Sequence, residues 1–170
     1  MSVSPYPSMS KWRNAFFLIT TPDMPTRMRK QIEEMQGYNL QLVIHKKLIE
    51  TDMNEKDGRL FLIIKKILFD FITPDEEKLL NDANGVMEVK ILDEGQRVSP
   101  MFLTKGKIQE HDAYCLTTHW NSFVAKNCLK IGHLIQLWSF RRVRLVDIEN
   151  EIFTSDLYFA LNTMDGRCFL

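Results

Sequence analysis

Short hydrophobic runs with a two-residue alternation dominate the chain. Hydrophobic residues recur at every second position in residues 40–44 and again in residues 86–92. This period is typical of a β-strand with one buried face. Similar short apolar runs, bounded by turn-forming residues, occur elsewhere. We therefore predict seven strands, at residues 40–48, 59–64, 86–92, 98–103, 113–116, 133–140 and 157–161.

A helical period precedes the first strand. After Pro25, the residues Met28, Ile32 and Met35 stand at positions i, i+4 and i+7, which places them on one face of a helix. Gly37 is a typical helix end. We expect a short amphipathic helix that packs on the flank of the domain.

Two further helices are predicted inside the stranded region. Thr73, Pro74 and Glu76 match a helix start, because the threonine caps the first turn, the proline fits that turn and the glutamate completes a capping box. This helix is expected to end near Asn81. In residues 120–124 the apolar side chains fall on one helical face, which indicates the second helix.

Seven short strands and two internal helices favour a mainly β fold, a small barrel whose ends are covered by helices. The chain has 170 residues, of which 45% are hydrophobic and 11% aromatic. This length and composition are enough to form the hydrophobic core of one domain. We divide it into a flexible lead-in with the amphipathic helix (1–39), a folded domain (40–163) and a tail (164–170).

The charges balance, with 22 basic and 22 acidic side chains, so no global field attracts nucleic acid or anionic lipid. Their distribution is uneven. Residues 45–68 carry six basic and four acidic side chains, whereas residues 70–94 carry two basic and eight acidic ones. The acidic segment 70–94 is a candidate surface for a protein partner. No apolar run approaches the roughly 18 residues of a membrane-spanning helix, and no membrane partner is expected.

A compact basic cluster, Arg141, Arg142 and Arg144, follows the 133–140 strand. Three interpretations fit it: a solvated strand end, a phosphate contact, or part of a nuclear import signal.

The residues that carry catalysis or hold metals in other proteins are not arranged for either role here. The four histidines lack the spacing of a zinc site. Asp75, Glu88 and Lys90 match the residue pattern PD…ExK of a nuclease motif. However, Asp75 is expected in the first turn of a helix, where the helix dipole favours a carboxylate without any catalytic role. We predict no catalytic residue, no metal and no cofactor.

The three cysteines are odd in number and lack CxxC spacing. This pattern favours reduced thiols in an intracellular protein over a disulfide framework. Cys115 and Cys128 are interpreted as small core residues.

Several short motifs follow one another in a fixed order. They read LVIHKKLIETDM (42–53), GRLFLIIKKIL (58–68), TPDEEKLL (73–80), HWNSFV (119–124) and LKIGHLIQLWSFR (129–141). Together they resemble the plant-specific B3 DNA-binding domain family, in the subgroup with a leader helix. The resemblance runs from Leu42 to Leu161. It implies a seven-stranded open pseudobarrel with two short helices, and a plant transcription regulator located in the nucleus.

In this family two arms of the pseudobarrel enter the DNA major groove. By position, the first arm is Glu50–Arg59, with two lysines at its base, and the second is Thr104–Asp112. Polar side chains in the groove read base edges, while Lys and Arg hold phosphates. The residues that the resemblance assigns to double-stranded DNA are Lys46, Lys47, Thr51, Asn54, Lys56, Arg59, Thr104, Lys105, Lys107 and Gln109.

An alternative hypothesis keeps the scaffold without DNA binding. Asp52, Asp57, Glu110 and Asp112 interrupt the two arms, and an acidic side chain that faces a phosphate weakens binding. These acids and the zero net charge also fit a diverged B3 scaffold that mediates protein–protein interaction. Its contact surface would be the acidic 70–94 segment or the leader helix.

Overall fold

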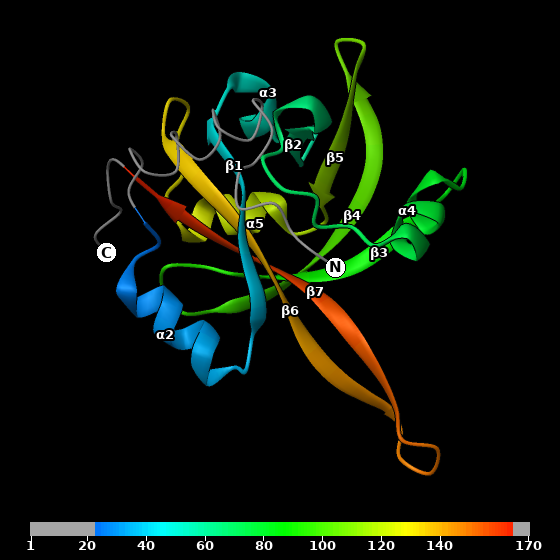
Figure 1. Ribbon diagram of the computed structural model, residues 1–170. Helices are drawn as coiled ribbons and strands as arrows, with labels where there is room; N and C mark the ends of the chain where they lie inside the picture. Colours follow the sequence, from blue (N-terminus) through cyan, green and yellow to red (C-terminus); the bar gives the residue numbers. More distant parts are fainter. Residues whose placement is uncertain (1–22, 165–170) are drawn as a thin grey trace, which may run out of the picture.

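Seven strands form one mixed sheet in the order β1-β6-β7-β3-β4-β5-β2 (Figure 1). The computed structural model describes residues 23–164, so the rest of the predicted lead-in and tail lies outside the described residues. The predicted seven-stranded sheet with short helices is confirmed. The strands are β1 (Tyr38–Lys47), β2 (Leu60–Ile63), β3 (Val86–Leu92), β4 (Val98–Ile108), β5 (His111–Thr117), β6 (Leu134–Asp147) and β7 (Ile152–Thr163).

Neighbouring strands are antiparallel except for β3 and β7. This parallel pair is three residue pairs long, from Lys90↔Tyr158 to Leu92↔Ala160. It joins two antiparallel halves, β1-β6-β7 and β3-β4-β5-β2. The edges of the sheet are β1 and β2, which are not paired with each other, so the sheet remains open.

The main hydrophobic core receives buried side chains from all seven strands. The helix α5 (Trp120–Lys126) adds Trp120 and Phe123, whose rings stack at 5.7 Å between centroids. A core shared by every strand of one sheet requires the sheet to curl around it, which is the barrel-like arrangement predicted from the sequence.

The leader helix α2 (Thr26–Glu34) packs against the sheet as predicted. Its buried Met28 and Ile32 share a second cluster with Leu42, Trp138 and other residues of β1, β6 and β7. The structure adds two short elements that the sequence analysis missed, the helix α3 (Glu50–Met53) and the 3-10 helix η1 (Ile64–Lys66).

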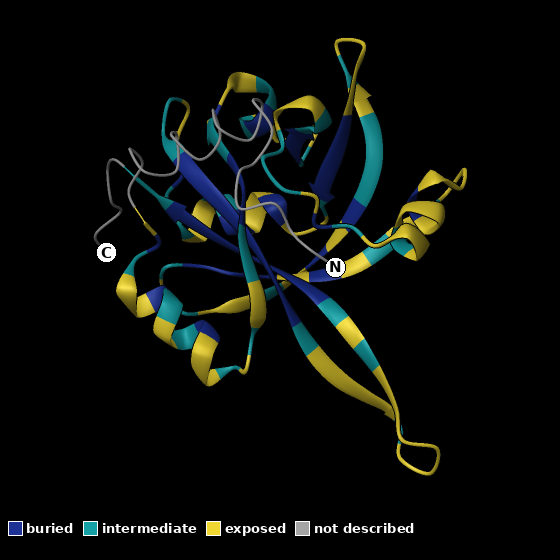
Figure 2. Ribbon diagram, in the orientation of Figure 1, coloured by how far each residue is buried: buried dark blue, intermediate teal, exposed yellow. Residues whose placement is uncertain are grey.

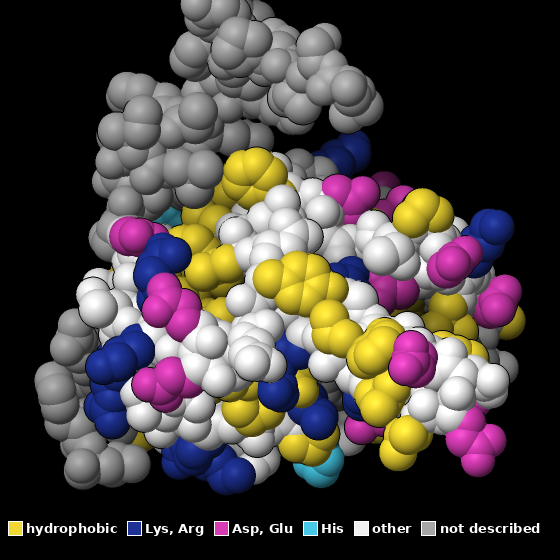
Figure 3. Space-filling view, turned by 60° about the horizontal axis from the view of Figure 1, so that its bottom comes forward, with side chains coloured by type: hydrophobic (Ala, Val, Ile, Leu, Met, Phe, Trp, Pro, Cys, Tyr) yellow, Lys and Arg dark blue, Asp and Glu magenta, His cyan; other side chains and the backbone are white. Residues whose placement is uncertain are grey.

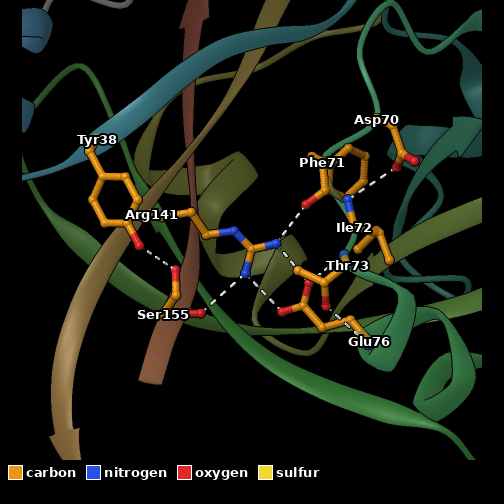
Figure 4. A network of polar contacts seen from close by, with 8 residues as sticks. All are labelled: Tyr38, Asp70, Phe71, Ile72, Thr73, Glu76, Arg141 and Ser155. Atoms are coloured by element: carbon orange, nitrogen blue, oxygen red, sulfur yellow. Dashed lines mark hydrogen bonds and ion pairs between the residues drawn. The ribbon is translucent and has the colours of Figure 1, made fainter. Parts of the chain in front are cut away.

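The predicted capping box begins the helix α4 (Pro74–Asn81). Glu76 N–H donates to Thr73 Oγ1 over 3.2 Å, and Thr73 N–H donates to Glu76 Oε1 over 3.0 Å. Arg141 then ties this helix to the sheet, since its guanidinium donates to both carboxylate oxygens of Glu76, at 2.8 and 2.7 Å, and to the Phe71 carbonyl at 2.7 Å (Figure 4). Arg141 is buried, which excludes a solvated strand end or a phosphate contact for this arginine.

Three strands extend well beyond their predicted ends. β4 continues to Ile108, β6 continues to Asp147, and β7 starts at Ile152. These additions form the outer parts of two hairpins, β4–β5 and β6–β7, which project from opposite ends of the molecule (Figure 1). Much of their outer surface is exposed (Figure 2), so their sequences lack the alternation that a half-buried strand shows.

The cysteine prediction holds for one of the two described cysteines. Cys115 is a free, buried thiol in a small cluster with Phe61 and Ala113. Cys128 is only half-buried and is disulfide-bonded, so its interpretation as a reduced core residue is wrong. Cys128 lies just after α5, and its positive φ of 50° marks the end of that helix. Its side chain does not belong to the hydrophobic core.

Candidate nucleic-acid interface

The first arm is a compact structure held by α5. It consists of α3 and a turn in which Asp57 N–H and Gly58 N–H both donate to the Asn54 carbonyl, at 3.1 and 3.0 Å. Gly58 has a φ of +59°, a left-handed conformation that favours glycine. Trp120 Nε1 donates to the Asp52 carbonyl over 2.8 Å, and Asn121 Nδ2 donates to the Glu55 carbonyl over 3.0 Å. The arm is therefore fixed to the body of the domain.

Lys46 points into the protein at the base of this arm. Its ammonium lies 2.8 Å from Asp52 Oδ2 and donates to the Phe61 carbonyl of β2 over 2.9 Å. Burial lowers the pKa of Lys46 below its ordinary value, although the Asp52 carboxylate opposes this effect. Lys46 thus links the two sheet edges, β1 and β2, where no backbone pairing joins them. This is a structural role, and it removes Lys46 from the set of exposed candidate contacts.

The other predicted residues of the first arm differ in exposure. Lys47 and Lys56 are exposed, and within residues 23–164 neither ammonium makes a hydrogen bond or an ion pair. Asn54 is exposed, with its Oδ1 accepting from Lys56 N–H at 2.9 Å. Thr51 and Arg59 are half-buried, and Arg59 Nε donates to the Asp57 carbonyl over 3.1 Å.

The second arm is the outer part of the β4–β5 hairpin. Along β4 the side chains alternate, so Thr104 shares a face with its partner Cys115, whereas Lys105 and Lys107 lie on the opposite face. Lys105 donates to Asn81 Oδ1 at the end of α4 over 2.7 Å. Lys107 is exposed and lies 3.9 Å from Asp112. The predicted contacts of this arm therefore do not form one surface.

Cys115 connects the bases of the two arms. Burial raises the pKa of its thiol, while the positive charge of Arg59 and the nearby Thr104 side chain oppose that rise. Arg59 is the last residue of the first arm, and Thr104 is the first residue of the second. Two predicted residues that are 45 positions apart in the sequence thus lie near the same thiol.

The tip of the second arm has unfavourable residues for its turn. Gln109 and Glu110 have φ values of 48° and 69°, and two positive φ values in a two-residue hairpin loop define a turn that prefers Asn-Gly. Replacing Gln109 by Asn and Glu110 by Gly should raise the free energy of unfolding by about 0.5–1 kcal/mol. Thermal unfolding should show a melting temperature higher by about 1–4 °C, and a lower one would contradict the turn assignment.

The residues assigned to DNA leave out part of the positive charge near the arms. Lys65 and Lys66 of η1 are exposed, and Lys66 lies close enough to Lys46 to lower its pKa. Both belong to the basic segment 45–68, but they follow the predicted strand 59–64 and lie outside both predicted arms. By contrast, the exposed Asp57 and the exposed Glu110 and Asp112 add negative charge to the two arms.

Among residues 23–164, no group of three or more His, Cys, Asp or Glu side chains is placed to hold a metal ion. Asp75 lies in the first turn of α4, and Glu88 and Lys90 are exposed on β3. No helix in the described part of the chain has both the length and the apolar character needed to cross a membrane.

Comparisons with known proteins agree with the sequence motifs. The chain matches the family described as B3 domain-containing protein At2g31720-like over residues 20–165. B3 domain-containing protein At2g31420 of Arabidopsis thaliana is 26% identical over 125 residues, which cover 69% of this chain and 60% of that protein. B3 domain-containing protein At1g05920 of the same plant is 28% identical over 133 residues, which cover 71% of this chain and 42% of that protein. The chain thus spans about half the length of these relatives.

Among solved structures, the DNA complex of the Arabidopsis thaliana transcription factor LEC2 is similar to this chain, with a TM-score of 0.43 and 17% identity. The match covers 70% of this chain and 94% of that chain.

Proposed function

This chain belongs to the family of B3 domain-containing proteins like At2g31720, and on that premise we propose that it binds double-stranded DNA through its two arms. The family is not enzymatic. We further propose that the binding is sequence-specific, that it regulates transcription in the nucleus of a plant cell, and that residues 40–163 form the binding domain.

The observation that carries the proposal is the placement of the arms. α3 and the tip of the β4–β5 hairpin project at the same end of the molecule (Figure 1). Their bases are joined through β5, because Cys115 pairs with Phe61 of β2, just after the first arm, and with Thr104 of β4, where the second arm begins. The major groove, about 12 Å wide, admits a two-stranded β-ribbon such as this hairpin. A groove-binding element that is held rigidly also loses less conformational entropy on binding.

The exposed residues of the arms divide into two proposed roles. The lysines contact phosphates, because each carries a compact positive charge on a flexible side chain that can reach a phosphate oxygen. They are Lys47, Lys56 and Lys107. Asn54 and Gln109 read base edges, since an amide both donates and accepts. The half-buried residues Thr51, Arg59, Thr104 and Lys105 have secondary roles, in positioning the arms or in contacts that the bound state brings closer.

Selection from a pool of random DNA duplexes at 50 and 200 mM salt tests the proposal. We expect enrichment of one motif. With three phosphate contacts, affinity should fall roughly 40-fold between the two salt concentrations, from a slope of about −0.9 per contact. If no duplex is retained even at 50 mM salt, the proposal is wrong, and the equal numbers of acids and bases in Thr104–Asp112 then favour the protein-binding scaffold.

Charge reversal at the arms should weaken binding without unfolding the protein. We expect Lys56→Glu and Lys107→Glu each to lower affinity for the selected duplex about tenfold and to reduce the salt slope by about 1. Fluorescence anisotropy measures both quantities. The matched control is Lys30→Glu on the exposed surface of α2, far from the arms, and it should bind normally. Equal affinity of all three variants and the wild type would refute the arm assignment.

A further inference from the structure

The outer part of the β6–β7 hairpin has two free strand edges. The pairing of β1 with β6 ends at Tyr38↔Arg141, and the pairing of β3 with β7 begins at Tyr158. Within the described residues, no third strand therefore pairs with segment 142–156, although the Ser155 carbonyl accepts a hydrogen bond from Arg141. Unpaired edges present backbone donors and acceptors that another strand can satisfy.

This outer hairpin also exposes large hydrophobic side chains. Leu145 and Phe153 are register partners, which puts them on the same face of the hairpin. Hydrophobic side chains gather on the side of the molecule that carries this hairpin (Figure 3). Contiguous exposed apolar surface of this kind marks an interaction site. The exposed apolar residues of the hairpin, with their exposed fractions, are Val143 (58%), Leu145 (43%), Val146 (56%), Ile148 (79%), Ile152 (51%) and Phe153 (60%).

Charge varies along the hairpin from base to tip. The tip, residues 145–152, contains Asp147, Glu149 and Glu151 and no lysine or arginine. The base carries Arg142, Arg144 and a single acid, Asp156, which pairs with Arg144 at 2.7 Å, and Arg144 is largely exposed. The hairpin is therefore apolar along its length, acidic at the tip and basic at the base.

We propose that this hairpin docks on the same hairpin of a second copy of the chain, in antiparallel orientation about a two-fold axis. A two-fold contact uses the same patch on both partners and must be self-complementary. The antiparallel arrangement meets this condition, since each acidic tip lies beside the partner's arginine-bearing base while the apolar faces pack together. A parallel arrangement would place acid against acid. The contact lies at the end of the molecule opposite the arms, so both copies keep their arms accessible (Figure 1).

Sedimentation velocity of the full chain at 1–100 μM tests the contact. We expect a reversible dimer, and a monomer at all concentrations for the double variant Leu145→Ser/Phe153→Ser. Ile131→Ser is the matched control, because Ile131 is 61% exposed but lies outside the hairpin, before β6. Circular dichroism spectra of all variants should match the wild-type spectrum, which shows that they fold. A wild-type protein that is monomeric at 100 μM, or a hairpin variant that dimerises normally, would overturn the proposal.

Charge reversal at the tip tests the orientation. In the antiparallel dimer, Glu149→Lys/Glu151→Lys should weaken dimerisation about tenfold, because lysines then face the partner's arginines. Adding Arg144→Glu to this variant should restore much of the lost affinity. Unchanged dimerisation of the tip variant would refute the antiparallel geometry, since two lysine tips in a parallel dimer repel as two acidic tips do.

Discussion

Replacing Asp52 by alanine is expected to destabilise the protein by about 3–5 kcal/mol, the range for removing one partner of a buried ion pair. The Asp52 side chain is fully buried. Its carboxylate accepts from the Lys46 ammonium, from Ile49 N–H at 3.0 Å and from Phe61 N–H at 3.1 Å. The alanine variant leaves a buried ammonium and two backbone donors without their acceptor. It also opens the link between β1 and β2.

Urea unfolding followed by circular dichroism measures this loss. Asp57→Ala is the matched control, because Asp57 lies in the same arm but is exposed, and it should unfold like the wild type. The double variant Lys46→Met/Asp52→Leu should recover much of the lost stability, since replacing both charges by apolar side chains removes the unpaired charge. If Asp52→Ala has the wild-type midpoint, the Lys46–Asp52 pair does not hold the arm.

Arg141→Met should cost a similar amount, about 3–5 kcal/mol. Arg141 is bound to both oxygens of Glu76 and to the Phe71 and Ser155 carbonyls, so the methionine leaves a partly buried carboxylate and two carbonyls unpaired (Figure 4). The loss should detach α4 from the sheet. Arg144→Met is the matched control, three residues along the same strand, and its exposed pair with Asp156 should contribute little to stability.

The Arg141 variant should also change how stability depends on pH. Burial alone would raise the pKa of Glu76, but the hydrogen bonds from Arg141 and Thr73 outweigh it and lower the pKa below the ordinary 4.5. The native carboxylate therefore holds its proton less tightly than the unfolded one. Its contribution is present above pH 4.5 and is lost as the pH falls toward the native pKa. Unfolding midpoints measured between pH 3 and pH 7 should show that Arg141→Met loses less stability at low pH than the wild type does. An equal loss of stability in both proteins would contradict the role given to the Arg141–Glu76 pair.

The sequence predicted the elements whose faces are half-buried. β3 begins and ends at the predicted residues 86–92, and Met28 and Ile32 of α2 reach the core as their helical period requires. The outer hairpin strands escaped prediction because both of their faces meet solvent, which removes the alternation. α3 escaped because four residues are too short for a helical period to appear.

The candidate site was less accessible to sequence reasoning. Neighbouring lysines 46 and 47 look alike in the sequence, but strand alternation turns Lys46 inward onto Asp52, which lies six residues later. Likewise, the basic cluster 141–144 gave no sign that its first arginine is the buried partner of Glu76, 65 residues earlier. Both pairs depend on contacts between segments that only the folded chain brings together.

The short parallel pair between β3 and β7 has a consequence for folding during synthesis. β2, β3, β4 and β5 lie within residues 60–117, so this half of the sheet can assemble as soon as the ribosome releases it. β1 emerges earlier, yet within residues 23–164 its only strand partner is β6, at residues 134–147. β1 must therefore wait for this partner until β6 has been synthesised, and the two halves join across three residue pairs only after β7 has followed.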